Sequence, residues 1–203
     1  MRKRFNLGDL GGSLCRAIPF AAALFATTVF VAAGPATSPA AAYADGAPPG
    51  FSGGFGESSC DACHFESAVN APPGRVTLTG IPERYASGQA YPITIALSRP
   101  GMMLGGFQFA ARFENGGGQA GTVAPGPGDG KRIKVEAGTI QYANQRQAGT
   151  DLAEPGTATW TVVWTAPATA GAVLFHVAAN AADKDDAARG DYVYTAVATS
   201  RPQ

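Results

Sequence analysis

"ATWTVVWTAP", residues 158–167, alternates small or polar residues with large apolar ones and ends at a proline. Successive side chains of a β-strand point to opposite sides, so Trp160, Val162 and Trp164 would share one face. Aromatic and β-branched residues at this period are typical of a strand with one buried face. We therefore expect both tryptophans to lie in the core of a β-sheet protein.

The same alternation recurs through the chain from residue 75 onward. It occurs in residues 75–81, 91–98, 105–113, 132–137, 158–167, 171–181 and 191–199. Turn-forming stretches such as "PGPGDG" (125–130) separate these runs. Short strands divided in this way are typical of an all-β sandwich or barrel, so we predict one all-β domain over residues 75–203.

Residues 180–190 are charged and unpatterned, and we expect an exposed loop between the last two strands. Carboxylates in a loop suit calcium, and this region carries Asp183, Asp185, Asp186 and Asp191. Lys184 and Arg189 interleave with them, and the twelve-residue loop with a central glycine is missing. A solvated loop is therefore the favoured interpretation.

The N-terminus has the features of an export signal. A basic "MRKR" precedes an apolar run from residue 17 to residue 33, and a small-x-small pattern ends at Ala44. This pattern predicts a cleaved signal peptide over residues 1–44 and a periplasmic or secreted protein. An uncleaved anchor is the alternative, but the apolar run is shorter than a membrane span needs. No later segment is apolar enough to span a bilayer.

Removal of residues 1–44 changes the charge and the cysteine content. The 15 basic and 15 acidic residues become 11 and 14, because Arg2, Lys3, Arg4, Arg16 and Asp9 are lost. A mildly acidic chain without a basic cluster is a poor nucleic-acid binder. Only Cys60 and Cys63 remain as cysteines, which excludes a disulfide framework.

Both cysteines belong to "CDACH", residues 60–64, within a Gly/Pro-rich and irregular segment over residues 45–74. Two cysteines three apart followed by a histidine is the attachment pattern of a c-type haem. Cys60 and Cys63 would then form thioethers to one haem c, and His64 would be the proximal iron ligand. A redox disulfide is less favoured because no βαβ pattern surrounds it. Zinc would need an unusual Cys₂His₂ spacing. Chance is the remaining alternative.

The second axial ligand stays open at this stage. His176 is the only other histidine, and it alternates with Phe175 and Val177 in a predicted strand. Met102 and Met103, in a predicted turn, offer a thioether instead, which would raise the reduction potential. An open sixth position is the third possibility, which would make gas sensing or peroxide chemistry arguable.

The β-region resembles the Reeler (reelin-type) domain, especially its bacterial, exported versions. The shared pattern consists, in order, of Gly88–Gln89, Gly106–Phe107–Gln108, Trp164–Thr165–Ala166–Pro167, Ala179–Asn180 and Gly190–Asp191 through Tyr194. The resemblance covers nearly everything from residue 75 to the end. It implies an immunoglobulin-like β-sandwich, often with a Cys-x-x-Cys-His upstream in bacterial members. The family supplies no catalytic residues.

The sequence therefore predicts an exported monohaem c-type cytochrome that passes single electrons to an unidentified redox partner protein. No nucleophile–base pair or paired carboxylates stand out, so we do not expect an enzyme. The competing interpretation is a non-catalytic, extracytoplasmic binding or adhesion module of Reeler type. In that case "CDACH" would be a structural or metal-binding clip.

Overall fold

The computed structural model describes residues 43–203. The predicted signal peptide, residues 1–44, falls outside the described residues except for its last two positions. None of the helices in the described part is long and apolar enough to cross a membrane.

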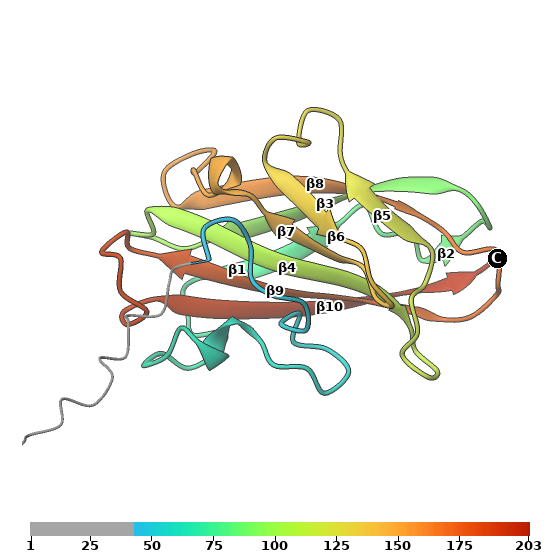
Figure 1. Cartoon of the computed structure of the whole chain (residues 1–203), viewed down its shortest axis with the longest axis horizontal. Coiled ribbons are helices and arrows are strands. Elements are labelled where there is room, and N and C mark those ends of the chain that lie inside the picture. Colours follow the sequence, from blue (N-terminus) through green and yellow to red (C-terminus); the bar gives the residue numbers. More distant parts are fainter. Residues whose placement is uncertain (1–42) are drawn as a thin grey trace, which may run out of the picture. The chain divides into compact units, whose positions relative to one another are not determined.

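Within residues 43–203 the chain forms ten strands in two sheets (Figure 1). The four-stranded sheet has the order β1-β3-β8-β5 and the six-stranded sheet the order β2-β10-β9-β4-β7-β6. Neighbouring strands are antiparallel except for β2 and β10. The predicted all-β sandwich is confirmed. The strands are β1 Arg75–Thr79, β2 Arg84–Tyr85, β3 Ala90–Ser98, β4 Leu104–Phe113, β5 Thr122–Pro125, β6 Ile133–Glu136, β7 Tyr142–Gln145, β8 Thr157–Thr165, β9 Val173–Ala182 and β10 Tyr192–Pro202.

The tryptophans of β8 lie in the core between the sheets, as the alternation predicts. Trp160 and Trp164 are fully buried, and their indole N–H groups donate to the backbone carbonyls of Gly149 and Ala120. The Trp164 ring meets Phe175 of the other sheet edge-on, with 4.8 Å between ring centroids. Such aromatic pairs add about 1 kcal/mol each to the burial of apolar surface.

Three strands were not expected from the sequence: β2, β5 and β7. The residues of β7, "YANQ", lack alternation because all four are buried. One side of the strand faces the sandwich core, and the other is covered by the N-terminal segment. A strand buried on both faces loses the period-two signal on which sequence analysis depends.

The predicted exposed loop over residues 180–190 is only partly correct. Asn180 still belongs to β9, and the exposed residues begin at Asp183. Asp191 is 2% exposed, so its assignment to a solvated acidic loop was wrong. It precedes β10 and turns inward, where two polar side chains bind its carboxylate.

Residues 43–74 form a third layer on the outer face of the six-stranded sheet (Figure 1). The segment is irregular apart from the short 3₁₀ helix η1 (Cys60–Ala62) and a bridge between Phe65 and Arg189. Its coverage explains why outward-facing positions such as Ala178 and Val193 are buried. The layer begins over β7, crosses β4 and reaches β9 and β10, which positions "CDACH" against the sheet.

Candidate functional site

The first part of the N-terminal segment is held to the sheet by two buried glutamines. Gln108 of β4 donates from Nε2 to the carbonyl oxygen of Pro48 at 2.7 Å and accepts from the amide N–H of Phe51. Gln145 of β7 donates from Nε2 to the carbonyl oxygen of Tyr43 at 3.0 Å. Buried amide side chains need partners, and here the segment supplies them, so residues 43–51 (the leader) are fixed over β4 and β7.

The second part of the segment presents the "CDACH" motif as one compact turn. The amide N–H groups of Cys63 and His64 both donate to the carbonyl oxygen of Cys60, at 3.2 and 2.9 Å. The 3₁₀ turn therefore brings both thiols and the imidazole close together in space. All three side chains line the same cavity.

This cavity has a volume of about 790 Å³ and lies between the two parts of the segment. The leader contributes Ala47, Pro48 and Phe51 to its lining, and β4 contributes Leu104 through Gln108. Gly106 lines the floor, where an added Cβ would lie 3.2 Å from Nε2 of Gln145. Cavities of this size and largely apolar lining are typical of cofactor sites.

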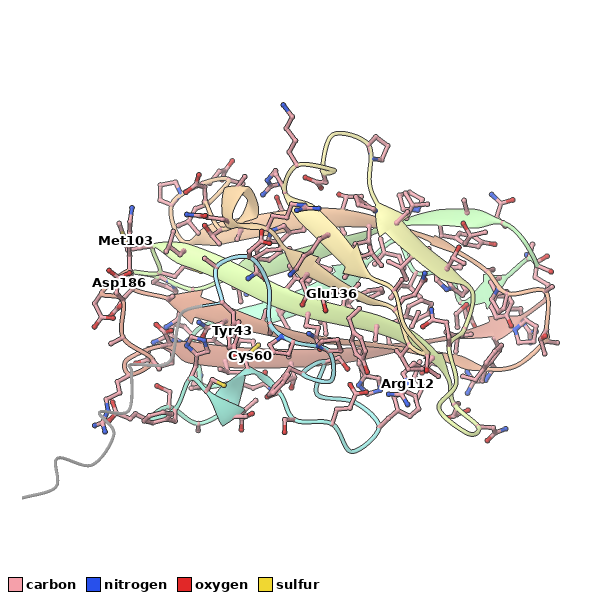
Figure 2. The ribbon with its side chains drawn as sticks, in the orientation of Figure 1. Tyr43, Cys60, Met103, Arg112, Glu136 and Asp186 are labelled. Atoms are coloured by element: carbon pink, nitrogen blue, oxygen red, sulfur yellow. The ribbon has the colours of Figure 1, made fainter. Side chains whose placement is uncertain are left out.

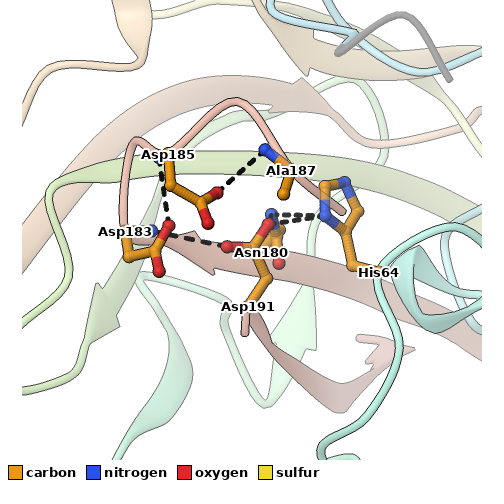
Figure 3. A network of polar contacts seen from close by, with 6 residues as sticks. All are labelled: His64, Asn180, Asp183, Asp185, Ala187 and Asp191. Carbon is orange, nitrogen blue, oxygen red and sulfur yellow. Dashed lines mark hydrogen bonds and ion pairs between the residues drawn. The ribbon is translucent and has the colours of Figure 1, made fainter. Parts of the chain in front are cut away.

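His64 is held by a buried carboxylate (Figure 3). Its Nδ1 lies 2.6 Å from Oδ2 of Asp191, whose side chain is 1% exposed. Asn180 donates from Nδ2 to the same oxygen at 2.9 Å, and this nitrogen also lies 3.2 Å from Nδ1. Because the carboxylate is an acceptor, Nδ1 is the donor, and in the neutral imidazole Nε2 then carries the lone pair. This is the arrangement found for histidines that bind a metal through Nε2.

The residues present fit a haem c. Two thiols and an imidazole with a free Nε2 share the lining of one cavity, which is the donor set that covalent haem attachment needs. A zinc site fits less well. Among residues 43–203, no three His, Cys, Asp or Glu side chains are placed to hold a metal ion. Burial raises the pKa of the Cys60 thiol to about 12.

The structure does not bring the predicted distal ligands into this cavity. His176 lies on β9 four residues before Asn180, which is about 13 Å along a strand. Its ring packs against Phe55, with 5.2 Å between ring centroids. Met102 is in the sandwich core and is 4% exposed. Met103 is 55% exposed, and it lies at the same end of the molecule as Asp186 without lining the cavity (Figure 2).

A second cluster fixes the loop between the leader and "CDACH". Glu57 accepts hydrogen bonds from Ser52 Oγ, from Arg112 Nη1 and from the Tyr142 hydroxyl. Burial and the Glu57 carboxylate raise the pKa of Tyr142 to about 12. The Arg112 guanidinium also lies over the Phe55 ring. The cluster therefore closes the loop down over His176, and burial beneath it lowers the pKa of that histidine.

Sequence reasoning missed the residues that support the site. Gln108, Gln145, Asn180 and Asp191 all contact the N-terminal segment from the sheet. Gln108 and Asn180 were visible only as parts of the Reeler-like motifs, without a role, and Asp191 was also considered as one acid of the exposed run. Their positions in β4, in β9 and before β10 bring them to one face of one sheet.

Comparison with known proteins gives likenesses of fold only. No family model and no curated protein matches the chain. Solved structures with similar folds include the human F-spondin reeler domain, at 18% identity and a TM-score of 0.42, over 64% of this chain and 89% of that one. The Reelin-N domain of F-spondin gives 18% and 0.47, over 71% of this chain and 95% of that one. A cohesin module from Clostridium perfringens gives 6% and 0.44, over 64% and 96%. Nothing about function follows at these values.

Proposed function

We propose that the chain is an exported monohaem c-type cytochrome that transfers single electrons to a redox partner protein. The observation that carries the proposal is the buried Asp191 carboxylate on Nδ1 of His64, in a cavity that both cysteines also line. A histidine that follows a Cys-x-x-Cys pair and is oriented for Nε2 ligation has the form expected of a proximal haem ligand.

Each residue has a separate task in this proposal. The thiols of Cys60 and Cys63 would add to the two vinyl groups of the porphyrin, and His64 would ligate the iron through Nε2. When bound, haem c supplies an iron that alternates between the ferric and ferrous states. Asp191 accepts a hydrogen bond from Nδ1–H of His64, which fixes the tautomer and orients the ring. Asn180 holds Asp191 in place from β9.

The proposal includes the Reeler-like character of the sandwich and the exported location. The Reeler-like motif residues Gln108, Asn180 and Asp191 are among those that hold the N-terminal segment, which links the sandwich to the proposed haem site. The export signal predicted from residues 1–44 would deliver the chain to the periplasm or the cell exterior, where this type of haem attachment occurs.

The test is expression of the full chain in a bacterium whose periplasm contains the cytochrome c maturation machinery. We expect a pyridine haemochrome spectrum of haem c and a mass increase of one haem. The double variant Cys60→Ser/Cys63→Ser should lose both signals. Asp61→Ala, which changes the exposed residue between the cysteines, should keep them. Absence of the α-band together with unmodified Cys60 and Cys63 would leave the binding-module interpretation instead.

A further inference from the structure

Residues 43–203 include nearly all of the histidine and methionine side chains, besides His64, that could bind iron strongly. The chain has two histidines and three methionines, and of these only Met1 lies outside residues 43–203. The question is whether His176, Met102 or Met103 can stand opposite His64 in the cavity. The structure gives a separate answer for the histidine and for the methionines.

His176 is fixed elsewhere by the loop above it. A methyl group added at Gly54 would lie 2.3 Å from Cγ of His176, so the backbone of this loop rests directly on the imidazole. Phe55 packs on the ring, and Glu57 with Arg112 holds the loop closed. Movement of His176 to the cavity would require this cluster to open and the strand to shift by about four residues.

Of the two methionines, one lies in the sandwich core and the other is exposed at the surface. Met102 packs in the core between the sheets, so its thioether would have to leave a close-packed interior to reach a ligand. Met103 is bound through its backbone N–H to the carbonyl oxygen of Ala182 at 2.8 Å, and its side chain is exposed. Neither sulfur is part of the cavity lining.

The wall opposite His64 is formed by the leader. His64 contacts β9 and the residue before β10, whereas residues 43–48 are bound to β4 and β7. Since β4 lies between β9 and β7, the floor of the cavity separates the two walls. After removal of residues 1–44 the leader still contributes Ala47, Pro48 and Phe51 to this side, and these residues are small or apolar.

We propose that His64 is the only axial ligand supplied by residues 43–203, and that a haem held in this cavity binds a small diatomic molecule of the CO and NO class. This inference rests on the proposed function, because it requires the covalent haem. An apolar wall without a strong ligand leaves room for such a molecule, and the nature of a distal pocket decides between ligand binding and electron transfer alone. The Asp191 carboxylate orients His64, the one ligand that remains among residues 43–203.

The experiment uses the purified holoprotein, with its covalent haem verified by the pyridine haemochrome spectrum. We expect a five-coordinate, high-spin iron by absorption and electron paramagnetic resonance, and a Soret shift when the reduced protein is exposed to CO. His176→Ala, Met103→Leu and Lys184→Ala should each leave the spin state unchanged. Lys184→Ala tests the amine that also lines the cavity.

The outcomes separate the two proposals. A six-coordinate, low-spin spectrum without a CO-induced shift would overturn the inference while the cytochrome assignment stands. Conversion to high spin in one variant alone would also overturn it and would identify the internal ligand. A chain without covalent haem would refute both. A Soret shift with CO that all three variants retain supports the inference.

Discussion

Replacement of Asp191 by alanine tests the support of His64 most directly. The Asp191 carboxylate is 1% exposed and accepts from His64 Nδ1 at 2.6 Å and from Asn180 Nδ2 at 2.9 Å. Each hydrogen bond to a charged group contributes about 1.5 to 3 kcal/mol. The substitution also removes the free-energy cost of burying a charged group. This offsets part of the hydrogen-bond energy that is lost. We therefore expect Asp191→Ala to lower the free energy of unfolding by about 3 kcal/mol.

The assay is urea unfolding of the purified chain, followed by tryptophan fluorescence, because Trp160 and Trp164 are both in the core. At a slope of about 2 kcal/mol per molar urea, the midpoint should fall by about 1.5 M. Asp185→Ala is the matched control, since it removes the same charge from an exposed position in the neighbouring loop. We expect it to change stability by less than about 0.5 kcal/mol.

The same variant has a redox readout in the holoprotein. Without the carboxylate, Nδ1 of His64 loses its acceptor and the imidazole becomes a weaker electron donor, so the midpoint potential should rise. Equal urea midpoints for Asp191→Ala and Asp185→Ala would refute the stabilising role of the pair. An unchanged potential in Asp191→Ala would refute its action through His64.

Three further predictions concern the loop, the buried histidine and the cavity floor. Glu57→Gln should destabilise the fold by about 2 kcal/mol in urea unfolding, since three donors converge on this partly buried carboxylate, whereas exposed Glu114→Gln should not. His176 has a lowered pKa when folded, so the unfolded chain binds more protons and stability should fall as the pH drops below about 6.5; His176→Gln should reduce this dependence. Gly106→Leu should fill the cavity floor and reduce haem loading, measured as haem per protein, while circular dichroism keeps the β-sheet spectrum.

Each of these predictions has an outcome that contradicts it. Equal loss of stability in the Glu57 and Glu114 variants would mean that the cluster does not close the loop. Identical pH profiles with and without His176 would show that its burial has no effect on proton binding. Full haem loading of the Gly106→Leu chain would place the haem outside this cavity.

The sequence was sufficient for the fold class because the signals that define it are local. The alternation around Trp160 and Trp164 depends only on which side of a strand faces the core, and the structure follows it residue by residue. The irregular segment before residue 75 was also visible, because Gly and Pro remove any periodic face. "CDACH" was likewise readable, since its chemistry depends on residues within five positions.

The support of the site depended on contacts between residues that are far apart in the chain. His64 and Asp191 are 127 positions apart, and only the pairing of β9 with β10 and the path of residues 43–74 across the sheet bring them together. From the sequence Asp191 looked like one acid of an exposed run. Its burial depends on residues that are distant in the chain, so no local sequence pattern indicates it. His176 faces outward from the same sheet as Asn180, yet its position along β9, beneath Phe55, separates it from the cavity. The local sequence pattern determined the strands and the Cys60–His64 motif, whereas the three-layer arrangement decided which side chains surround that motif.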